Sequence, residues 1–230
     1  MNLLITGTSR GIGLEMVRVS VERGWRVFAC CRHPQQAEAL LGLATLAPGK
    51  VSVHIADMRE LATLQSLAYE LRNESIDMLI NNAGVYGPDQ NQFGEVDVAG
   101  WEDAFLVNCI APLKLAELML GQLQGGRQKI IACLSSKMAS MADNGSGGSY
   151  IYRSSKAALN AVVKSMSVDL AARDIKAVAL HPGWVKTDMG GPNAEISVRE
   201  SVNRLFEILL ALEASDSGRF IDIDGKDIPW

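Results

Sequence analysis

The sequence predicts an α/β fold, a three-layer doubly wound arrangement in which helices flank a mostly parallel, seven-stranded sheet. Short apolar runs of strand length alternate with longer amphipathic stretches almost from end to end, and this alternation indicates βαβ units. The 230 residues are enough for one large core. No linker, repeat or low-complexity tract divides them, so we expect residues 1–230 to form a single domain.

Each element is expected from its own apolar pattern. The expected strands are Leu3–Thr6, Arg26–Cys31, Val51–Ile55, Met78–Ile80, Lys129–Leu134, Lys176–Leu180 and Arg219–Ile221. The expected helices lie near Gly13–Arg23, Gln35–Ala44, Glu60–Asn73, Trp101–Gly121, Ile151–Arg173 and Val198–Glu213. Sheets of this kind bind ligands at the carboxyl ends of their strands, and the motifs described below follow strands or open the next helix.

Composition excludes several classes of function. The chain has 22 Lys and Arg against 26 Asp and Glu, a net charge of −4 with no long basic run, so nucleic acid is not expected as a partner. No stretch resembles a secretion signal or is long enough to span a membrane, and we expect a cytoplasmic protein. Cys30, Cys31 and Cys133 lie in expected strands as buried thiols, and no set of ligands has the spacing of a metal site.

The first strand is followed directly by a glycine-rich turn, TGTSRGIG at residues 6–13, and then by a helix. Glycine is needed where the backbone takes a positive φ or where a phosphate must approach the main chain. The following helix N-terminus favours an anion. The spacing differs from that of a P-loop. A nucleotide site and a turn without a ligand are equally compatible with this motif alone.

The end of the second strand favours one dinucleotide over the other. An acidic residue about 20 positions beyond the glycines suits the ribose of NAD, whereas an arginine suits the 2′-phosphate of NADP. Arg32 lies 19 positions beyond Gly13, and Arg10 lies inside the glycine turn. Two guanidinium groups could bind that phosphate through charge-assisted hydrogen bonds, so the sequence favours NADP(H) over NAD(H).

Two further strand ends carry candidate cofactor contacts. Asn81–Gly84 directly follows the fourth strand, where small and amide residues allow the backbone to pass close to a flat ring. Asp57 and Met58 follow the third strand and could border an adenine ring. An ordinary turn in the first case, and a helix cap at Asp57 in the second, are the alternatives.

Tyr152 and Lys156 in YRSSK form the most specific pair. Residues four apart lie on one face of a helix, so the phenol and the ammonium can point into one pocket. A tyrosine titrates near pH ~10 in water, and a neighbouring cation favours its ionised form. We therefore expect a lowered Tyr152 pKa and a role as general acid or base, although such a pair on a helix is often structural.

These motifs together resemble the short-chain dehydrogenase/reductase family along essentially the whole chain. TGTSRGIG, NNAG, the Asn of LVN, the serines of CLSSK, YRSSK and HPGWVKTD occur in the family's order. The segments LHPGWVKTDMGG and DGKDIPW look like those of the sniffer-type carbonyl reductases and of the bacterial C-factor group. The resemblance implies a Rossmann fold.

The resemblance also implies the roles of individual residues. Tyr152 would give a proton to a substrate carbonyl, Lys156 would lower the tyrosine pKa and hold the nicotinamide ribose, and Ser136 would hydrogen-bond the carbonyl oxygen. Asn108 would anchor a water relay behind Lys156, and Thr187 would bind the carboxamide. The expected cofactor contacts are Gly7, Ser9, Arg10, Gly11, Ile12, Gly13, Arg32, Asp57, Met58, Asn82, Ala83, Gly84, Tyr152, Lys156, Pro182, Gly183, Val185 and Thr187.

Some alternatives stay open. Ser136 and Tyr152 are 16 residues apart, slightly more than is usual in the family, so Ser135 is a second candidate for the carbonyl-binding serine. The excess, in DNGSGGS, suggests a mobile loop over the substrate, and Tyr86 and Pro88 either line the pocket or belong to the surface.

The expected function is NADP(H)-dependent reduction of aldehyde, ketone or quinone-type carbonyls, on a small-molecule carbonyl or alcohol. The alternative is a C-factor-like, dinucleotide-binding signalling protein with little turnover. A serine hydrolase is disfavoured because no G-x-S-x-G elbow occurs. By analogy with the family we expect a homodimer or homotetramer.

Overall fold

The computed structural model describes residues 1–230 and contains one seven-stranded sheet. Its strands are β1 (Asn2–Thr6), β2 (Arg26–Cys31), β3 (Val51–Ile55), β4 (Met78–Asn81), β5 (Ile130–Leu134), β6 (Lys176–Leu180) and β7 (Phe220–Ile221). The order is β3-β2-β1-β4-β5-β6-β7, and every neighbouring pair is parallel. The predicted α/β fold is confirmed, with a sheet that is wholly rather than mostly parallel.

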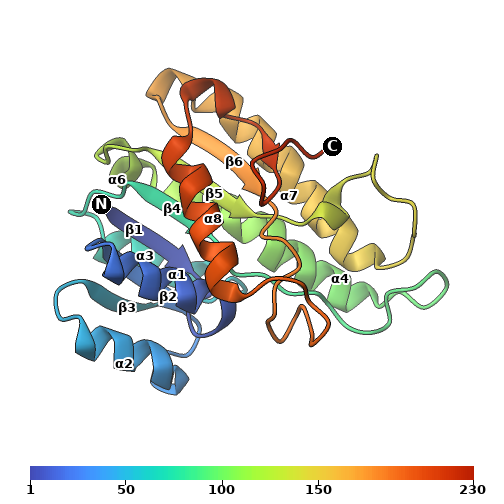
Figure 1. Ribbon diagram of the computed structural model, residues 1–230, viewed down its shortest axis with the longest axis horizontal. Helices are drawn as coiled ribbons and strands as arrows, with labels where there is room; N and C mark the ends of the chain where they lie inside the picture. Colours follow the sequence, from blue (N-terminus) through green and yellow to red (C-terminus); the bar gives the residue numbers. More distant parts are fainter.

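Helices cover both faces of this sheet (Figure 1). One layer consists of α1 (Gly11–Glu22), α2 (Glu38–Leu46) and α8 (Val198–Ala211). The other consists of α3 (Leu61–Glu70), α4 (Val98–Phe105), α5 (Ala111–Leu118), α6 (Leu120–Gln124) and α7 (Tyr150–Asp169). The helices after β1 and β2 cover one face and those after β3, β4 and β5 cover the other, because the strand order changes direction after β3. The last helix, α8, returns to the first face, which gives the three layers.

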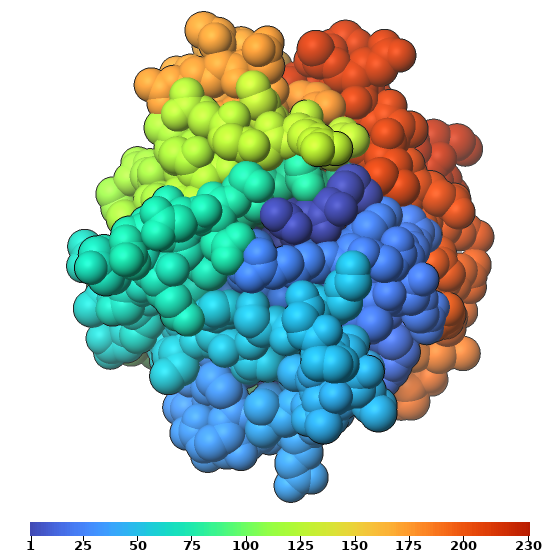
Figure 2. Space-filling model, turned by 90° about the vertical axis from the view of Figure 1, so that its left-hand side faces the viewer, coloured from blue at the N-terminus to red at the C-terminus, as the bar shows by residue number.

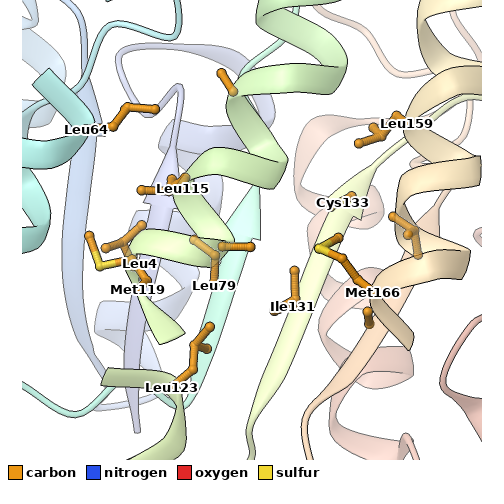
Figure 3. Packing of buried hydrophobic residues seen from close by; sticks show 14 of the residues in the cluster. Leu4, Leu64, Leu79, Leu115, Met119, Leu123, Ile131, Cys133, Leu159 and Met166 are labelled. Carbon is orange, nitrogen blue, oxygen red and sulfur yellow. The ribbon is translucent and has the colours of Figure 1, made fainter. Parts of the chain in front are cut away.

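The alternation of side chains along each strand divides the core into two. Leu4 in β1 and Ile131 in β5 pack with α3, α5 and α7, as Figure 3 shows. Their neighbours Leu3 and Ile130 point to the opposite face, towards α1 and α8. Both clusters consist of residues with almost no exposed surface. Because both faces of the sheet are buried, the strands are continuous apolar runs in the sequence.

The largest difference from the sequence-based elements lies at the predicted helix Trp101–Gly121. The helix begins at Val98, because the Asp97 carboxylate accepts hydrogen bonds from the N–H groups of Ala99 and Gly100 and so caps it. A π-helical turn then runs from Leu106 to Ile110. It lies directly before α5, in which Pro112 has no N–H to donate to the preceding turn.

The two ends of the sheet differ. Figure 2 looks onto the end where the strands start, and there the first residues of the chain lie among segments distant in sequence. Asn2 contacts Ser75 and Asp77 at this end. No helix is both long and apolar enough to cross a membrane. The loops that precede α4, α7 and α8 gather at the opposite end, towards which the strand arrows point in Figure 1.

Candidate active site

A cleft of about 620 Å³ opens at the carboxyl ends of the strands. It lies where the chain order reverses between β1 and β4, the usual ligand site of such a sheet. The structure brings most of the sequence-predicted residues into its lining: Gly7, Ser9, Arg10, Gly11, Ile12, Gly13, Arg32, Asp57, Met58, Asn82, Ala83, Gly84, Tyr152, Lys156, Pro182 and Thr187. Asn108, Ser136, Gly183 and Val185 lie outside this lining.

The glycine turn after β1 is packed so closely that larger side chains do not fit. A Cβ on Gly13 would lie 2.2 Å from the carbonyl oxygen of Gly7, and Gly7 itself has a φ of +70°. The Asn82 side chain donates hydrogen bonds to the carbonyl oxygens of Thr6 at 2.8 Å and Gly7 at 3.1 Å. The turn is therefore fixed against the end of β4, with α1 starting at Gly11 and its N-terminus at the cleft.

The cationic side chains at the rim differ in their partners. The Arg10 guanidinium, at the glycine turn, forms an exposed ion pair with Asp188 at 3.0 Å. Arg32, at the end of β2, is exposed and has no such partner in the structure. The Asp57 carboxylate accepts a hydrogen bond from the Arg59 backbone N–H at 3.0 Å, a local turn before α3.

Arg32 and the glycine turn therefore fit a dinucleotide phosphate. The turn leaves no room for a Cβ at Gly13, and the helix N-terminus beside it offers backbone donors to an anion. Arg32 supplies an uncompensated positive charge at the ribose end. The donors, the charge and the cleft volume all fit NADP(H).

Lys156 is buried in α7 with its ammonium aimed at the sheet. Its Nζ donates a hydrogen bond of 2.7 Å to the carbonyl oxygen of Leu134 at the end of β5. Gly84 permits this approach, since a Cβ there would lie 3.3 Å from Nζ. Burial lowers the Lys156 pKa to about 8, because desolvation disfavours the ammonium.

Tyr152 lies one turn before Lys156, with the lysine Nζ 5.9 Å from the centroid of its ring. Burial raises the pKa of Tyr152 to about 12, and the nearby Ser136 side chain opposes this increase. The lowered pKa expected from the sequence is therefore wrong, because desolvation of the buried phenol dominates. Spacing identified the cation but not the depth at which both groups are buried.

The two candidate serines point to different partners. The Ser135 hydroxyl donates to Oδ1 of Asn160 at 2.7 Å. The Ser136 hydroxyl accepts from the Met138 N–H at 3.2 Å, at the start of a 3-10 turn (η3, Lys137–Ala139), and its side chain lies close enough to Tyr152 to lower the pKa of the phenol. Although the Ser135 residue reaches the cleft lining, Ser136 is the one whose side chain acts on the phenol.

Asn108 lies in the π-helical turn and is fully buried. Its amide group holds Val85 from both sides: Oδ1 accepts from the Val85 N–H at 2.8 Å, and Nδ2 donates to the Val85 carbonyl at 2.8 Å. Nδ2 also donates to Ser155 at 2.9 Å. In this structure Asn108 joins the chain after Gly84 to α7. A Cβ on Gly84 would lie 3.1 Å from Asn108 Oδ1 and 3.3 Å from Lys156 Nζ, so the amide oxygen and the ammonium both lie against Gly84.

The segment after β6 supplies the last wall. Gly183, with a φ of +82°, packs against Ile196 and sits behind the lining. Val185 is buried and pairs with Ile196 in an isolated bridge. Thr187 lines the cleft, and its hydroxyl donates to the Val185 carbonyl at 3.3 Å and accepts from the Gly190 N–H at 3.1 Å.

Sequence reasoning assigned no role to several residues of the lining, among them Arg18, Arg59, Lys186, Asp188 and Val198. Lys186 and Asp188 flank Thr187 within the motif HPGWVKTD, so the motif itself was the available signal. No sequence signal marks Arg59, because its bidentate ion pair is with Asp103, which is 44 positions away.

Comparison with known proteins places these features in a family. The family model described as short chain dehydrogenase matches residues 1–196. The C-signal protein of Myxococcus xanthus is 42% identical over 167 residues, which cover 73% of this chain and all of that protein.

Two solved structures match the whole chain. The carbonyl reductase Sniffer of D. melanogaster has a TM-score of 0.94, 33% identity and 99% of its chain covered. A carbonyl reductase from Pseudomonas aeruginosa PAO1 in complex with NADP has a TM-score of 0.88, 38% identity and 99% of its chain covered.

Proposed function

Because the chain belongs to the short-chain dehydrogenase/reductase family, we propose that it reduces aldehyde, ketone or quinone-type carbonyl groups with NADP(H). One observation carries the proposal most directly. Tyr152, with the Ser136 side chain close to its phenol and Lys156 one helical turn away, lines the same cleft as the glycine turn. The similarity to two carbonyl reductases, one of them in complex with NADP, supports the same class of reaction.

The cofactor would be held by the residues that line the cleft. The N-terminus of α1 and the glycine turn would bind the pyrophosphate, and Arg32 with Arg10 would bind the 2′-phosphate. Thr187 would hydrogen-bond the carboxamide, and Lys156 the nicotinamide ribose. Bound NADPH would supply the hydride.

The chain itself would supply the proton and hold the carbonyl. Tyr152, protonated at neutral pH, would give its phenolic proton to the carbonyl oxygen as negative charge develops there. The Ser136 hydroxyl would turn from the phenol to the same oxygen and stabilise that charge. The Lys156 ammonium, held by the Leu134 carbonyl, would stabilise the phenolate that remains. Asn108, through Val85 and Ser155, would keep α7 at the correct distance from β4.

The proposal is tested by mixing the protein with NADPH and aldehydes, ketones, diketones and quinones while cofactor absorbance is followed. Tyr152→Phe is the matched variant, because it removes the proton donor and keeps the ring. We expect kcat to fall about 10²- to 10⁴-fold, the usual contribution of a general acid, with NADPH affinity unchanged. Equal turnover by the variant would overturn the assignment of Tyr152.

A second candidate function is signalling through a bound dinucleotide, favoured by the 42% identity to C-signal of Myxococcus xanthus. In that case NADPH would bind with an affinity similar to that of the reductases, but no carbonyl would be consumed at a useful rate. The intact Ser136, Tyr152 and Lys156 favour the enzyme, because binding alone requires no proton donor. The same absorbance assay, together with direct titration of NADPH, separates the two.

The remaining expectations form part of the proposal. A homodimer or homotetramer would use α5 and α7, as in the family, and light scattering on the purified protein measures this directly. Ile110 and Val168 keep 44% and 66% of their surface exposed on this side, enough for an apolar contact between copies. Cell fractionation tests the cytoplasmic location.

A further inference from the structure

Tyr86 is the residue beside the catalytic candidates that has no assigned role. It follows the NNAG turn, and its ring stacks on that of Tyr152 with centroids 4.7 Å apart and an angle of 27° between the planes. This distance and angle are those of an offset-stacked aromatic pair. One face of the Tyr152 phenol is therefore covered by a second phenol.

The Tyr86 ring is held at both ends. Before it, Val85 is fixed by both of its backbone hydrogen bonds to Asn108. At its far end, the Tyr86 hydroxyl lies 2.9 Å from the Ser149 hydroxyl. Ser149 precedes α7 in a left-handed conformation, with a φ of +48°.

The residue after Tyr86 reinforces the same contact. Gly87 has a φ of +93°, and a Cβ there would lie 2.8 Å from the Ile151 side chain. The segment 85–87 thus lies directly on the first turn of α7, the turn that carries Tyr152. Any tilt of that turn would have to break the stack, the hydroxyl contact and the Gly87 packing together.

The loop after Tyr86 also contacts the first turn of α7. Phe93 is 89% exposed, and its ring lies 6.4 Å from that of Tyr150, which precedes Tyr152 by two residues. The Tyr150 N–H donates to the Asn91 carbonyl, so the loop 86–97 stays against α7. The loops before α4 and before α7 extend together on one side of the molecule in Figure 1.

We propose that Tyr86 is a positioning residue that fixes the Tyr152 ring in the orientation needed for proton transfer. This inference rests on the proposed function for the identity of the reacting group. A stacked ring held at both ends restricts the phenol to one orientation, and a small misplacement of a reacting group is costly in rate.

The test uses 3-fluorotyrosine in the full chain and follows the Tyr152 resonance by ¹⁹F NMR, assigned by its loss in Tyr152→Phe. Tyr86→Leu removes the stacked ring, Tyr86→Phe keeps it without the hydroxyl, and Tyr69→Leu replaces an exposed tyrosine on α3. We expect the Tyr152 resonance to move in Tyr86→Leu, and to stay close to that of the unsubstituted protein in the other two. A resonance unchanged by Tyr86→Leu would overturn the positioning role.

Catalysis is measured on the same proteins by kcat and KM with NADPH, with acetophenone and butanone as substrates. In Tyr86→Leu we expect kcat for both ketones to fall about tenfold because Tyr152 is less well placed, and KM to change little. Tyr86→Phe is expected to recover most of the lost kcat, and Tyr69→Leu to lose none. A kcat unchanged in Tyr86→Leu would overturn the positioning role.

Failure of the proposed function gives a different pattern. If the unsubstituted protein turns over no carbonyl compound at all, the proposed reductase function is wrong. The ¹⁹F shift of Tyr152 then still decides the positioning role, because it does not depend on turnover.

Discussion

The cleft has two halves built by different physical means. The cofactor half, formed by the glycine turn and the NNAG turn, is made of backbone: Gly13 leaves no space for a Cβ, and Asn82 is bonded to two carbonyl groups of the turn. The proposed substrate half is made of side chains, among them Tyr152 on α7 and Met189 on the loop after β6, which leaves 53% of its surface exposed. A backbone site recognises a charge and a shape common to all dinucleotides, whereas a side-chain site can vary with the substrate.

Burial also separates the halves. Arg10 and Arg32 are exposed to water at the cofactor rim, so their charges are screened and exchangeable. Tyr152 and Lys156 are buried between the halves, and burial moves the pKa of each away from its usual value. Binding strength should therefore depend on the rim, and chemistry on the buried pair.

The largest effect is expected where the cofactor half is most closely packed. Gly13→Ala would place a methyl group 2.2 Å from the Gly7 carbonyl oxygen. The turn must then shift at a cost of about 3 kcal/mol. Because that turn is the proposed pyrophosphate site, we expect NADPH affinity to fall about 100-fold, as measured by fluorescence titration.

The matched control for this change is Gly42→Ala, in the interior of α2. No atom lies within 4 Å of the added Cβ, and the glycine does not have a positive φ. Alanine is a better helix former, so the free energy of unfolding should rise by about 0.5–1 kcal/mol while NADPH affinity stays constant. If Gly13→Ala bound NADPH as well as Gly42→Ala, the glycine turn would not be the phosphate site.

The next effect distinguishes the two dinucleotides. Arg32→Glu replaces the cation at the end of β2 by an anion facing the proposed 2′-phosphate. A hydrogen bond to a charged group contributes about 1.5–3 kcal/mol, so we expect NADPH affinity to fall about 10- to 100-fold. NADH lacks that phosphate and should bind with little change.

Arg173→Glu, an exposed arginine in the turn before β6, is the control for net charge. It lies at the end of the sheet where the strands start, opposite the cleft, and should affect neither dinucleotide. An equal loss of affinity for NADH and NADPH in Arg32→Glu would show that this arginine does not bind the 2′-phosphate.

These two halves also differ in what the sequence could predict. The glycine turn and the pair Tyr152–Lys156 are local patterns, because their spacing within one turn or one helix fixes their relative position. The strands were predicted closely because a parallel sheet buries continuous apolar runs. Sequence spacing in this way identified many of the residues that line the cleft.

Contacts between distant segments could not be predicted in the same way. Tyr86 stacks on a residue 66 positions later, and no period in the sequence encodes that. The π-helical turn at Asn108 depends on Val85 and Ser155, which lie in other elements. The raised Tyr152 pKa depends on the depth of burial, which is known only once the loops are in place.

The buried pair predicts a pH dependence. Burial lowers the Lys156 pKa to about 8, so the ammonium is present below pH 8 and is lost above it. If this charge binds the ribose and supports Tyr152, kcat/KM for NADPH should fall about tenfold per pH unit above 8. Lys156→Arg keeps its charge there, and the residual activity of that variant should not show the decline.

Stability should move in the opposite direction over the same range. The lysine pKa is about 10.4 in the unfolded chain, so between pH 8 and that value the unfolded state binds more protons than the folded state. The free energy of unfolding attributable to this group should therefore rise with pH across the window. Urea titrations of the unsubstituted protein and Lys156→Met, compared at pH 7 and pH 9.5, measure the difference. A Lys156→Met variant with the same pH dependence as the unsubstituted protein would contradict the lowered pKa.

The smallest effect is expected at the ion pair that joins the two halves. Arg10 belongs to the glycine turn and Asp188 to the loop after β6, and both side chains are more than three-quarters exposed. Surface pairs of this kind are weak, but here the carboxylate also occupies one of the two guanidinium groups available to a phosphate. Asp188→Asn should therefore raise NADPH affinity about two- to fivefold and change NADH affinity less. The gain should disappear in high salt, where exposed charges are screened. A gain that persists in high salt, or is equal for both dinucleotides, would indicate that the loop had moved. The two halves would then be coupled by shape rather than by charge.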